Sequence, residues 1–149
     1  MDLDQLTKQP SEVKEMHVMG DRLLVLKDGA STKGRYAVIH QFLQPGGGPP
    51  PHVHTREDEV FFVVDGEFDI LLGDSTIHAS KGAVVDAPRN VRHTFKCVGN
   101  QPGSILFLCY PAGVEEFFNA ASQLEIPKEL PKLFEIAKQY GLLFEAAKE

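Results

Sequence analysis

Residues 46–66, GGGPPPHVHTREDEVFFVVDG, decide the fold of this 149-residue chain. The middle of this stretch places His52 and His54 two positions apart, and Glu59 follows. Side chains at positions i and i+2 of a β-strand lie on the same face, so the two imidazoles can converge on one metal ion. Glu59 lies at an odd offset from His54, which would send it to the opposite face of an unbroken strand. We therefore expect a turn or bulge within residues 55–58.

A second stretch, GAVVDAPRNVRHTFKC at residues 82–97, carries another histidine. His93, Phe95 and Cys97 alternate there with charged or polar residues, which predicts a strand with His93 on its inward face. Three histidines and one glutamate on inward faces would be costly to bury unless a shared partner satisfies them. A divalent metal ion is such a partner.

Both stretches resemble the sequence motifs of the cupin superfamily. The first motif is a Gly, five residues, His-x-His, three or four residues, Glu, six residues and a Gly, and all five positions are filled by Gly46, His52, His54, Glu59 and Gly66. The second is a Gly, five residues, Pro-x-Gly, two residues, His, three residues and an Asn. It is matched by Gly82, Pro88 and His93, whereas Asn90 and Cys97 stand where the second Gly and the Asn are expected.

The resemblance implies an all-β fold, the double-stranded β-helix or jelly-roll barrel, with a metal inside its mouth. It implies that the ligands are His52, His54, Glu59 and His93. The alternative is a metal-free cupin that keeps its histidines for hydrogen bonding to a substrate. The segments DEVFFVVDGEF at 58–68 and PAGVEEFF at 111–118 resemble single-domain bacterial cupins of the quercetin-dioxygenase-like group.

Hydrophobic periodicity and the spacing of Gly and Pro predict the secondary structure. We expect strands at residues 22–27, 36–43, 60–64, 68–72, 83–87, 91–98 and 105–110, and helices at 114–121 and 131–140. Residues 1–149 are interpreted as one domain, with a barrel core at about 21–111 and C-terminal helices within about 112–149.

Asp65-Gly66 is typical of a two-residue hairpin turn. Such a hairpin would pair Val64 with Glu67, Val63 with Phe68, Phe61 with Ile70, and Glu59 with Leu72. It also leaves a partly apolar outer face at Phe62, Val64 and Leu71. We expect the C-terminal helices or a second copy of the chain to cover that face, and the resemblance favours a homodimer.

The inward rows of these strands predict the substrate pocket. Its expected residues are Phe61, Val63, Phe68, Ile70, Phe95, Cys97 and Phe107. An apolar, aromatic lining favours a largely apolar or aromatic small molecule over a sugar phosphate. For Cys97, the sequence leaves open whether the thiol packs in the core or tunes the pocket.

The ligand set predicts the charge of the centre but not the metal. Nitrogen and oxygen ligands suit iron, manganese, nickel, cobalt, copper or zinc. Three neutral imidazoles and one carboxylate leave a divalent ion with a net charge of 2 − 1 = +1, which favours an anionic oxygen ligand. Glu59 is the candidate catalytic base if substrate displaces it from the metal, and otherwise it only tunes the ion.

Three hypotheses for function remain open. The first is a metal-dependent dioxygenase that acts on a small oxygenated substrate. The second is a non-redox metalloenzyme, namely an isomerase, cyclase or decarboxylase that stabilises an enolate. The third is a binding protein without turnover. Oxygen consumption would divide the first two.

Composition bears on the partners and the location of the chain. With 15 Lys and Arg against 21 Asp and Glu, the net charge is −6. This charge argues against binding to nucleic acid or to an anionic membrane surface. Asp2 and Asp4 stand where a signal peptide would carry positive charge, and no apolar run approaches the roughly 20 residues of a membrane span. We expect a cytoplasmic protein.

Overall fold

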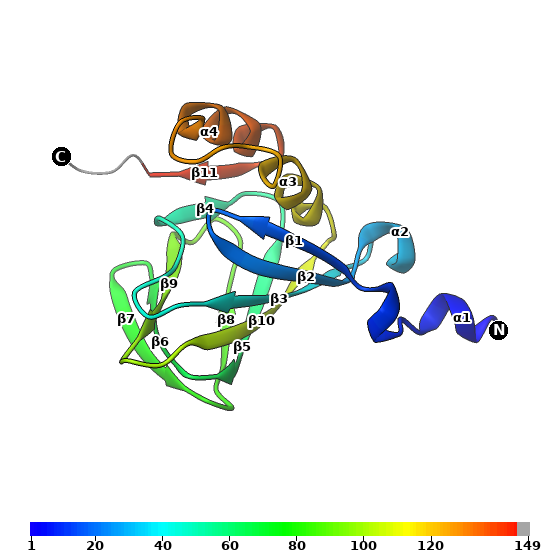
Figure 1. Cartoon of the computed structure of the whole chain (residues 1–149), viewed down its shortest axis with the longest axis horizontal. Coiled ribbons are helices and arrows are strands. Elements are labelled where there is room, and N and C mark those ends of the chain that lie inside the picture. The colour runs from blue at the N-terminus through cyan, green and yellow to red at the C-terminus, as the bar shows by residue number, and fades with distance from the viewer. Residues whose placement is uncertain (146–149) are drawn as a thin grey trace.

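Two antiparallel sheets face each other in the computed structural model, which describes residues 1–145 (Figure 1). One sheet has the order β1 (Lys14–Val18), β2 (Asp21–Lys27), β3 (Ala37–Leu43), β10 (Gly103–Tyr110), β5 (Asp58–Asp65), β8 (Val84–Ala87). The other has the order β11 (Leu142–Phe144), β4 (His52–His54), β9 (His93–Val98), β6 (Glu67–Leu72), β7 (Ser75–Ser80). The predicted all-β jelly-roll class is confirmed.

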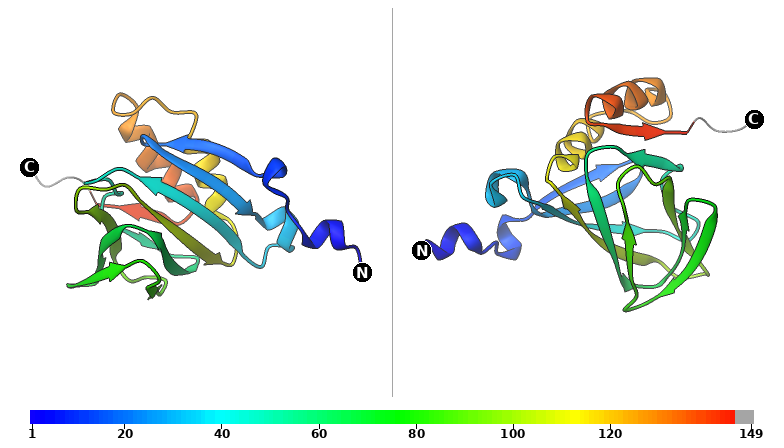
Figure 2. Two further views of the ribbon diagram at one scale, coloured as in Figure 1. Left: turned by 60° about the horizontal axis from the view of Figure 1, so that its bottom comes forward. Right: turned by 180° about the vertical axis from the view of Figure 1, so that it is seen from behind.

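The helices lie outside the barrel. They are α1 (Leu3–Leu6), a 3-10 turn (Pro10–Glu12), α2 (Gly29–Thr32), α3 (Val114–Ala121) and α4 (Leu130–Gln139). The last two follow the predicted helices closely and lie with β11 over the end of the barrel formed by β4 (Figures 1 and 2). Strand β11 pairs with β4, so the C-terminal segment extends the second sheet beside the predicted metal ligands. Within residues 1–145, no helix has both the length and the apolarity to cross a membrane.

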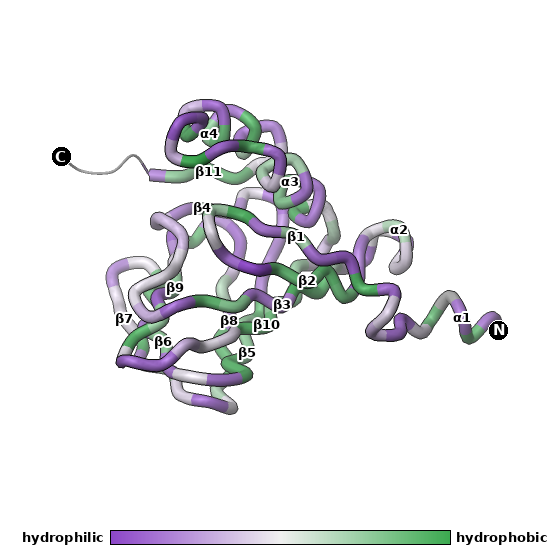
Figure 3. The backbone as a smooth tube through the Cα atoms, viewed as in Figure 1, coloured by the Kyte–Doolittle hydropathy of each residue, from purple (hydrophilic) through white to green (hydrophobic). Residues whose placement is uncertain are grey.

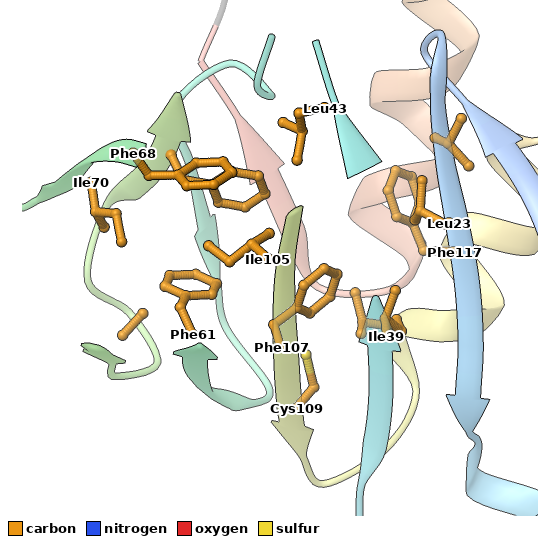
Figure 4. Packing of buried hydrophobic residues seen from close by; sticks show 14 of the residues in the cluster. Leu23, Ile39, Leu43, Phe61, Phe68, Ile70, Ile105, Phe107, Cys109 and Phe117 are labelled. Carbon is orange, nitrogen blue, oxygen red and sulfur yellow. The ribbon is translucent and has the colours of Figure 1, made fainter. Parts of the chain in front are cut away.

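The strands have the period-two pattern of a half-buried sheet. In β3 every second side chain is buried. Hydropathy alternates less than burial does, since β2, β5 and β10 contain continuous hydrophobic stretches (Figure 3). Figure 4 shows the inward side chains meeting between the two sheets, among them Phe61, Phe68 and Ile105. The same core continues to buried residues of α3, α4 and β11, among them Phe117, Leu133 and Leu142.

The predicted hairpin at Asp65-Gly66 is wrong, because β5 and β6 belong to different sheets. Strand β5 pairs with β10 and β8, so Phe61 lies opposite Phe107 and Val85 and not Ile70. The other three predicted pairs fail for the same reason, since β6 pairs with β7 and β9.

The physical cause is a corner at Gly66. Gly66 has φ +79°, and a Cβ there would lie 2.7 Å from Cα of Gly103. The chain therefore crosses from one sheet to the other with its backbone against the start of β10. The inward assignment survives this error, because Phe61, Val63, Phe68 and Ile70 are all buried.

Candidate metal centre

Four side chains from both sheets meet at one end of the barrel. His52 and His54 extend from β4, and His93 lies on β9 directly opposite His52. Glu59 reaches the same place from β5 in the other sheet. Each of the four is at most 5% exposed, and their ligand atoms all lie within 4.8 Å of one another. The expected break after His54 is confirmed, since β4 ends there and β5 starts at Asp58.

The polar atoms at the middle of this group lie close together but are not hydrogen-bonded. Oε2 of Glu59 lies 2.8 Å from Nε2 of His93 and 3.4 Å from Nε2 of His54. Despite this closeness, Glu59 Oε2 and His93 Nε2 are fully buried without a hydrogen bond. Buried polar atoms left in this way point to a missing ligand, and imidazole nitrogens with a carboxylate oxygen suit a divalent transition metal. The residues present therefore fit the metal that the sequence predicts.

The outer nitrogens of the three histidines are held by acceptors. Nδ1 of His52 donates to the carbonyl oxygen of Pro50 at 2.8 Å, and Nδ1 of His93 donates to that of Val91 at 3.1 Å. Nδ1 of His54 contacts Oε1 of Glu57 at 2.5 Å. A carbonyl or carboxylate can only accept, so these contacts leave each Nε2 free to bind the ion.

Glu57 is a residue of the centre that the sequence did not reveal. It stood in a polar turn, and nothing in its spacing distinguished it from its neighbours. In the structure it is 4% exposed and forms a carboxylate–histidine pair with His54. With the carboxylate of Glu57 included, the net charge of the centre with a divalent ion bound falls from +1 to 2 − 1 − 1 = 0. The centre is therefore less attractive to anions than the ligands alone indicate.

Burial and mutual charge set the protonation of the group. Burial, with the nearby His54 and His93, lowers the pKa of His52 to about 3. Burial alone would raise the pKa of Glu59, but the charge of His54 and the approach of His93 outweigh it and hold that pKa at about 2. At neutral pH, Glu59 is thus a carboxylate and His52 a neutral imidazole, which are the forms that bind a metal.

The two cysteines have different surroundings. Sγ of Cys109 donates to Oε1 of Glu59 at 3.1 Å, a contact that the sequence did not reveal. Burial, together with the charge of Glu59, raises the pKa of Cys109 well above its usual value and keeps it a thiol donor. Cys97 lies deeper in the barrel, opposite Phe68 on β6, with its Sγ 3.6 Å from the carbonyl oxygen of Gln101.

A cavity of about 170 Å³ opens beside His52, His54 and Glu59. Of the predicted pocket residues, Phe95 and Phe107 line it. The structure places the other five in the packed core and not on the cavity wall; they are Phe61, Val63, Phe68, Ile70 and Cys97. The inward rows run the full length of the barrel, so period two alone cannot tell which end is filled.

Elements outside the two motifs supply most of the remaining wall. The β1–β2 hairpin, β3, α3 and β11 contribute side chains, including Val18, Asp21, Gln41, Phe117, Phe118 and Phe144. The C-terminal segment therefore forms one wall of the cavity. The hydrophobic periodicity of the helix at 114–121 does not by itself say whether that helix lies over the mouth or the side of a barrel.

Residues 39–109 match the family model described as Cupin domain. Over this stretch, a little under half of the chain, the protein is similar to a cupin domain. A germin-like protein of Arabidopsis thaliana, subfamily 2 member 5, is 35% identical over 69 residues, which cover 42% of this chain and 32% of that protein. The chain thus spans about a third of the length of the curated relatives it matches.

Solved structures share the fold of this chain. KdgF from Halomonas sp. aligns with a TM-score of 0.64 and 19% identity, over 72% of this chain and 94% of that one. The polyketide cyclase RemF from Streptomyces resistomycificus aligns with a TM-score of 0.58 and 22% identity, over 70% and 78% of the two chains. At these identities the likeness shows the fold alone.

Proposed function

We propose that this protein is a metal-dependent dioxygenase that acts on a small, largely apolar or aromatic oxygenated substrate. The observation that carries the proposal is the group of four buried ligands with unpartnered inner atoms beside an aromatic-walled cavity. A divalent transition ion held by His52, His54, Glu59 and His93 would supply Lewis-acid chemistry or, if redox-active, electron transfer.

The cavity wall supports the substrate class. Four phenylalanines from three different regions face the cavity with Phe95, namely Phe107, Phe117, Phe118 and Phe144. Gly48 allows the wall to close on β9, because a Cβ there would lie 2.0 Å from the carbonyl oxygen of Phe95. A volume of about 170 Å³ is small beside the roughly 300–1,000 Å³ of drug-sized ligand sites. These features favour a compact aromatic or enolic molecule.

The buried carboxylate of Glu57 favours redox chemistry over Lewis-acid chemistry at this centre. Its buried carboxylate adds a second negative charge next to the ligand His54. Negative charge near a metal in a low-dielectric site stabilises the more oxidised ion and weakens Lewis acidity. Glu59 would be a ligand of the metal. If the substrate displaces it from the metal, its carboxylate would act as a general base toward a substrate proton.

A non-redox metalloenzyme is the second candidate. RemF, a solved structure with the same fold, is named a polyketide cyclase. The same four ligands and cavity would serve a cyclase, an isomerase or a decarboxylase.

The test begins with elemental analysis of protein purified without chelators or a His-tag. The double variant His52→Ala/His54→Ala is compared with His17→Ala/His78→Ala, which removes two exposed histidines outside the centre. We expect a near-stoichiometric redox-active metal in the wild type and in the control, and its loss in the first variant. Oxygen uptake is then measured with a panel of small phenols and enols.

Turnover with oxygen consumption would support the dioxygenase. Turnover without it, or stoichiometric zinc, would favour the second candidate. No metal in any of the proteins, even after reconstitution, would overturn the ligand assignment.

We also propose that the chain forms a homodimer through its outer sheet face. Val64 is 40% exposed and Val84 is 58% exposed, while α4 packs on α3 and β11 and leaves them uncovered. Sedimentation velocity is the measurement that checks this proposal, and a monomeric mass would contradict it.

A further inference from the structure

A hydrogen-bonded polar pair lines the cavity in addition to the metal ligands. Asp21 begins β2 and Gln41 lies on the neighbouring strand β3. Nε2 of Gln41 donates to Oδ2 of Asp21 at 2.9 Å, and Gln41 is only 8% exposed. A buried amide paired with a carboxylate on an otherwise apolar wall is expensive to keep, so its presence calls for an explanation.

The hydrogen bond between Gln41 and Asp21 determines which of their polar atoms remain free to bind a ligand. A carboxylate only accepts hydrogen bonds, so the amide nitrogen of Gln41 must face Asp21, and Oε1 of Gln41 points elsewhere. Within the part of the chain that the structure describes, neither this oxygen nor Oδ1 of Asp21 accepts a protein hydrogen bond. The pair therefore presents acceptor oxygens and one negative charge to the cavity.

The strand register places the pair at the opposite end of the cavity wall from the ligands. Gln41 is aligned with Ile105 on β10 and, beyond it, with Val63 on β5. Glu59 lies four residues along β5 from Val63, and two strand spacings separate β5 from β3. The Cα atoms of Glu59 and Gln41 are therefore roughly 17 Å apart. Phe107 lies midway along β10 between these two levels and lines the cavity.

We propose that Asp21 and Gln41 recognise a hydroxyl or ammonium group of the substrate, whose other end carries the oxygen that binds the metal. The body between the two ends packs on Phe107. This inference rests on the proposed function, because it takes the metal centre as the other contact. It narrows the substrate class to compact aromatic or enolic molecules with a hydrogen-bond donor remote from the metal-binding oxygen.

Two matched probes test this inference without any turnover. Benzohydroxamate offers two oxygens to a metal, and 4-hydroxybenzohydroxamate adds a hydroxyl group at the far end of the ring. Each is titrated into the cobalt-loaded protein, and the visible absorption of the cobalt ion reports binding. We expect the hydroxylated probe to bind about tenfold more tightly to the wild type, as one hydrogen bond to a charged acceptor would provide.

The variants locate the source of this preference. Asp21→Leu/Gln41→Met removes both partners together, so no buried polar group is left unpaired. We expect it to bind the two probes with affinities within twofold of each other. Asp86→Leu makes the same charge change on the exposed side of β8 and should keep the tenfold preference. Asp21→Asn retains the shape of the pair and should lose part of the preference.

The possible results separate this inference from the proposed function. Equal binding of the two probes to the wild type, or a preference that persists in the double variant, overturns the recognition pair and leaves the metal centre intact. If neither probe changes the cobalt spectrum, the metal centre does not bind ligands, and the proposed function fails together with this inference. If the double variant does not fold, the graded loss in Asp21→Asn decides.

Discussion

The two ends of the barrel are built from the same strands but are filled differently. One end is a packed core in which Phe61, Phe68 and Ile105 interlock between the sheets (Figure 4). At the other end, the inward positions hold three histidines, a glutamate and a cavity. Strand β9 contributes to both, with His93 at one end and Cys97 at the other.

The difference shows how the chain tolerates a buried polar centre. Four polar ligands out of water cost free energy, while close-packed aromatic side chains at the other end stabilise the same strands. The packed end should therefore control stability, and the ligand end should control metal binding.

Phe68→Ala should have the largest effect, because Phe68 is fully buried in the packed end. We expect a loss of about 3–5 kcal/mol in the free energy of unfolding, measured by denaturant titration. The control is Phe144→Ala, which removes a half-buried ring that already faces the cavity and should cost about half as much. Equal losses in the two variants would contradict the division between the ends.

Glu57→Gln should weaken metal binding by about 10–100-fold, since outer partners of ligating histidines orient the ring and raise its basicity. A competition titration with a coloured chelator measures this affinity. Because Gln keeps the size of the side chain, the unfolding midpoint of the metal-free protein should change little. An unchanged metal affinity would show that Glu57 only fills space beside His54.

The two buried cysteines form a matched pair for the next prediction. Cys109→Ala should lower metal affinity about tenfold by removing the donor to Glu59, whereas Cys97→Ala should leave it unchanged. Each should cost about 1 kcal/mol of stability through lost packing. Cys109→Ser keeps a donor and should restore the metal affinity. A similar loss of affinity in both Ala variants would refute the specific contact with Glu59.

The exposed pair of His78 and Asp69 contrasts with the buried pair of His54 and Glu57, and changing it should have the smallest effect. The hydrogen bond from Nδ1 of His78 to Asp69 raises the pKa of His78. A raised folded-state pKa adds stability below the unfolded value of about 6.5, and this stability is lost as the pH rises through the folded value. The melting temperature of His78→Gln should thus lie slightly below that of the wild type at pH 5.5 and equal it at pH 8.5. High salt should remove the difference at pH 5.5, and a difference that survives salt would contradict a solvent-screened pair.

The sequence determined the inward rows and pointed to the four residues that could hold a metal. Period-two alternation assigns faces locally, and the His-x-His spacing with a turn before Glu59 is a local property of residues 52–59. The last helix was also legible, since Pro131 and Gly141 lie at the ends of its amphipathic pattern. These features depend on contacts within a few residues along the chain.

The tertiary structure decided everything that depends on contacts between distant segments. The corner at Gly66, which puts β5 and β6 in different sheets, depends on the close approach of Gly103. The cavity wall depends on β2, β3, α3 and β11 reaching the ligand end, and the roles of Glu57 and Cys109 depend on which atoms face them there. A turn sequence looks the same whether its flanking strands pair with each other or belong to different sheets, and an inward residue looks the same whether it lines a cavity or fills the core. Sheet partners and packing are chosen by the free energy of the whole fold.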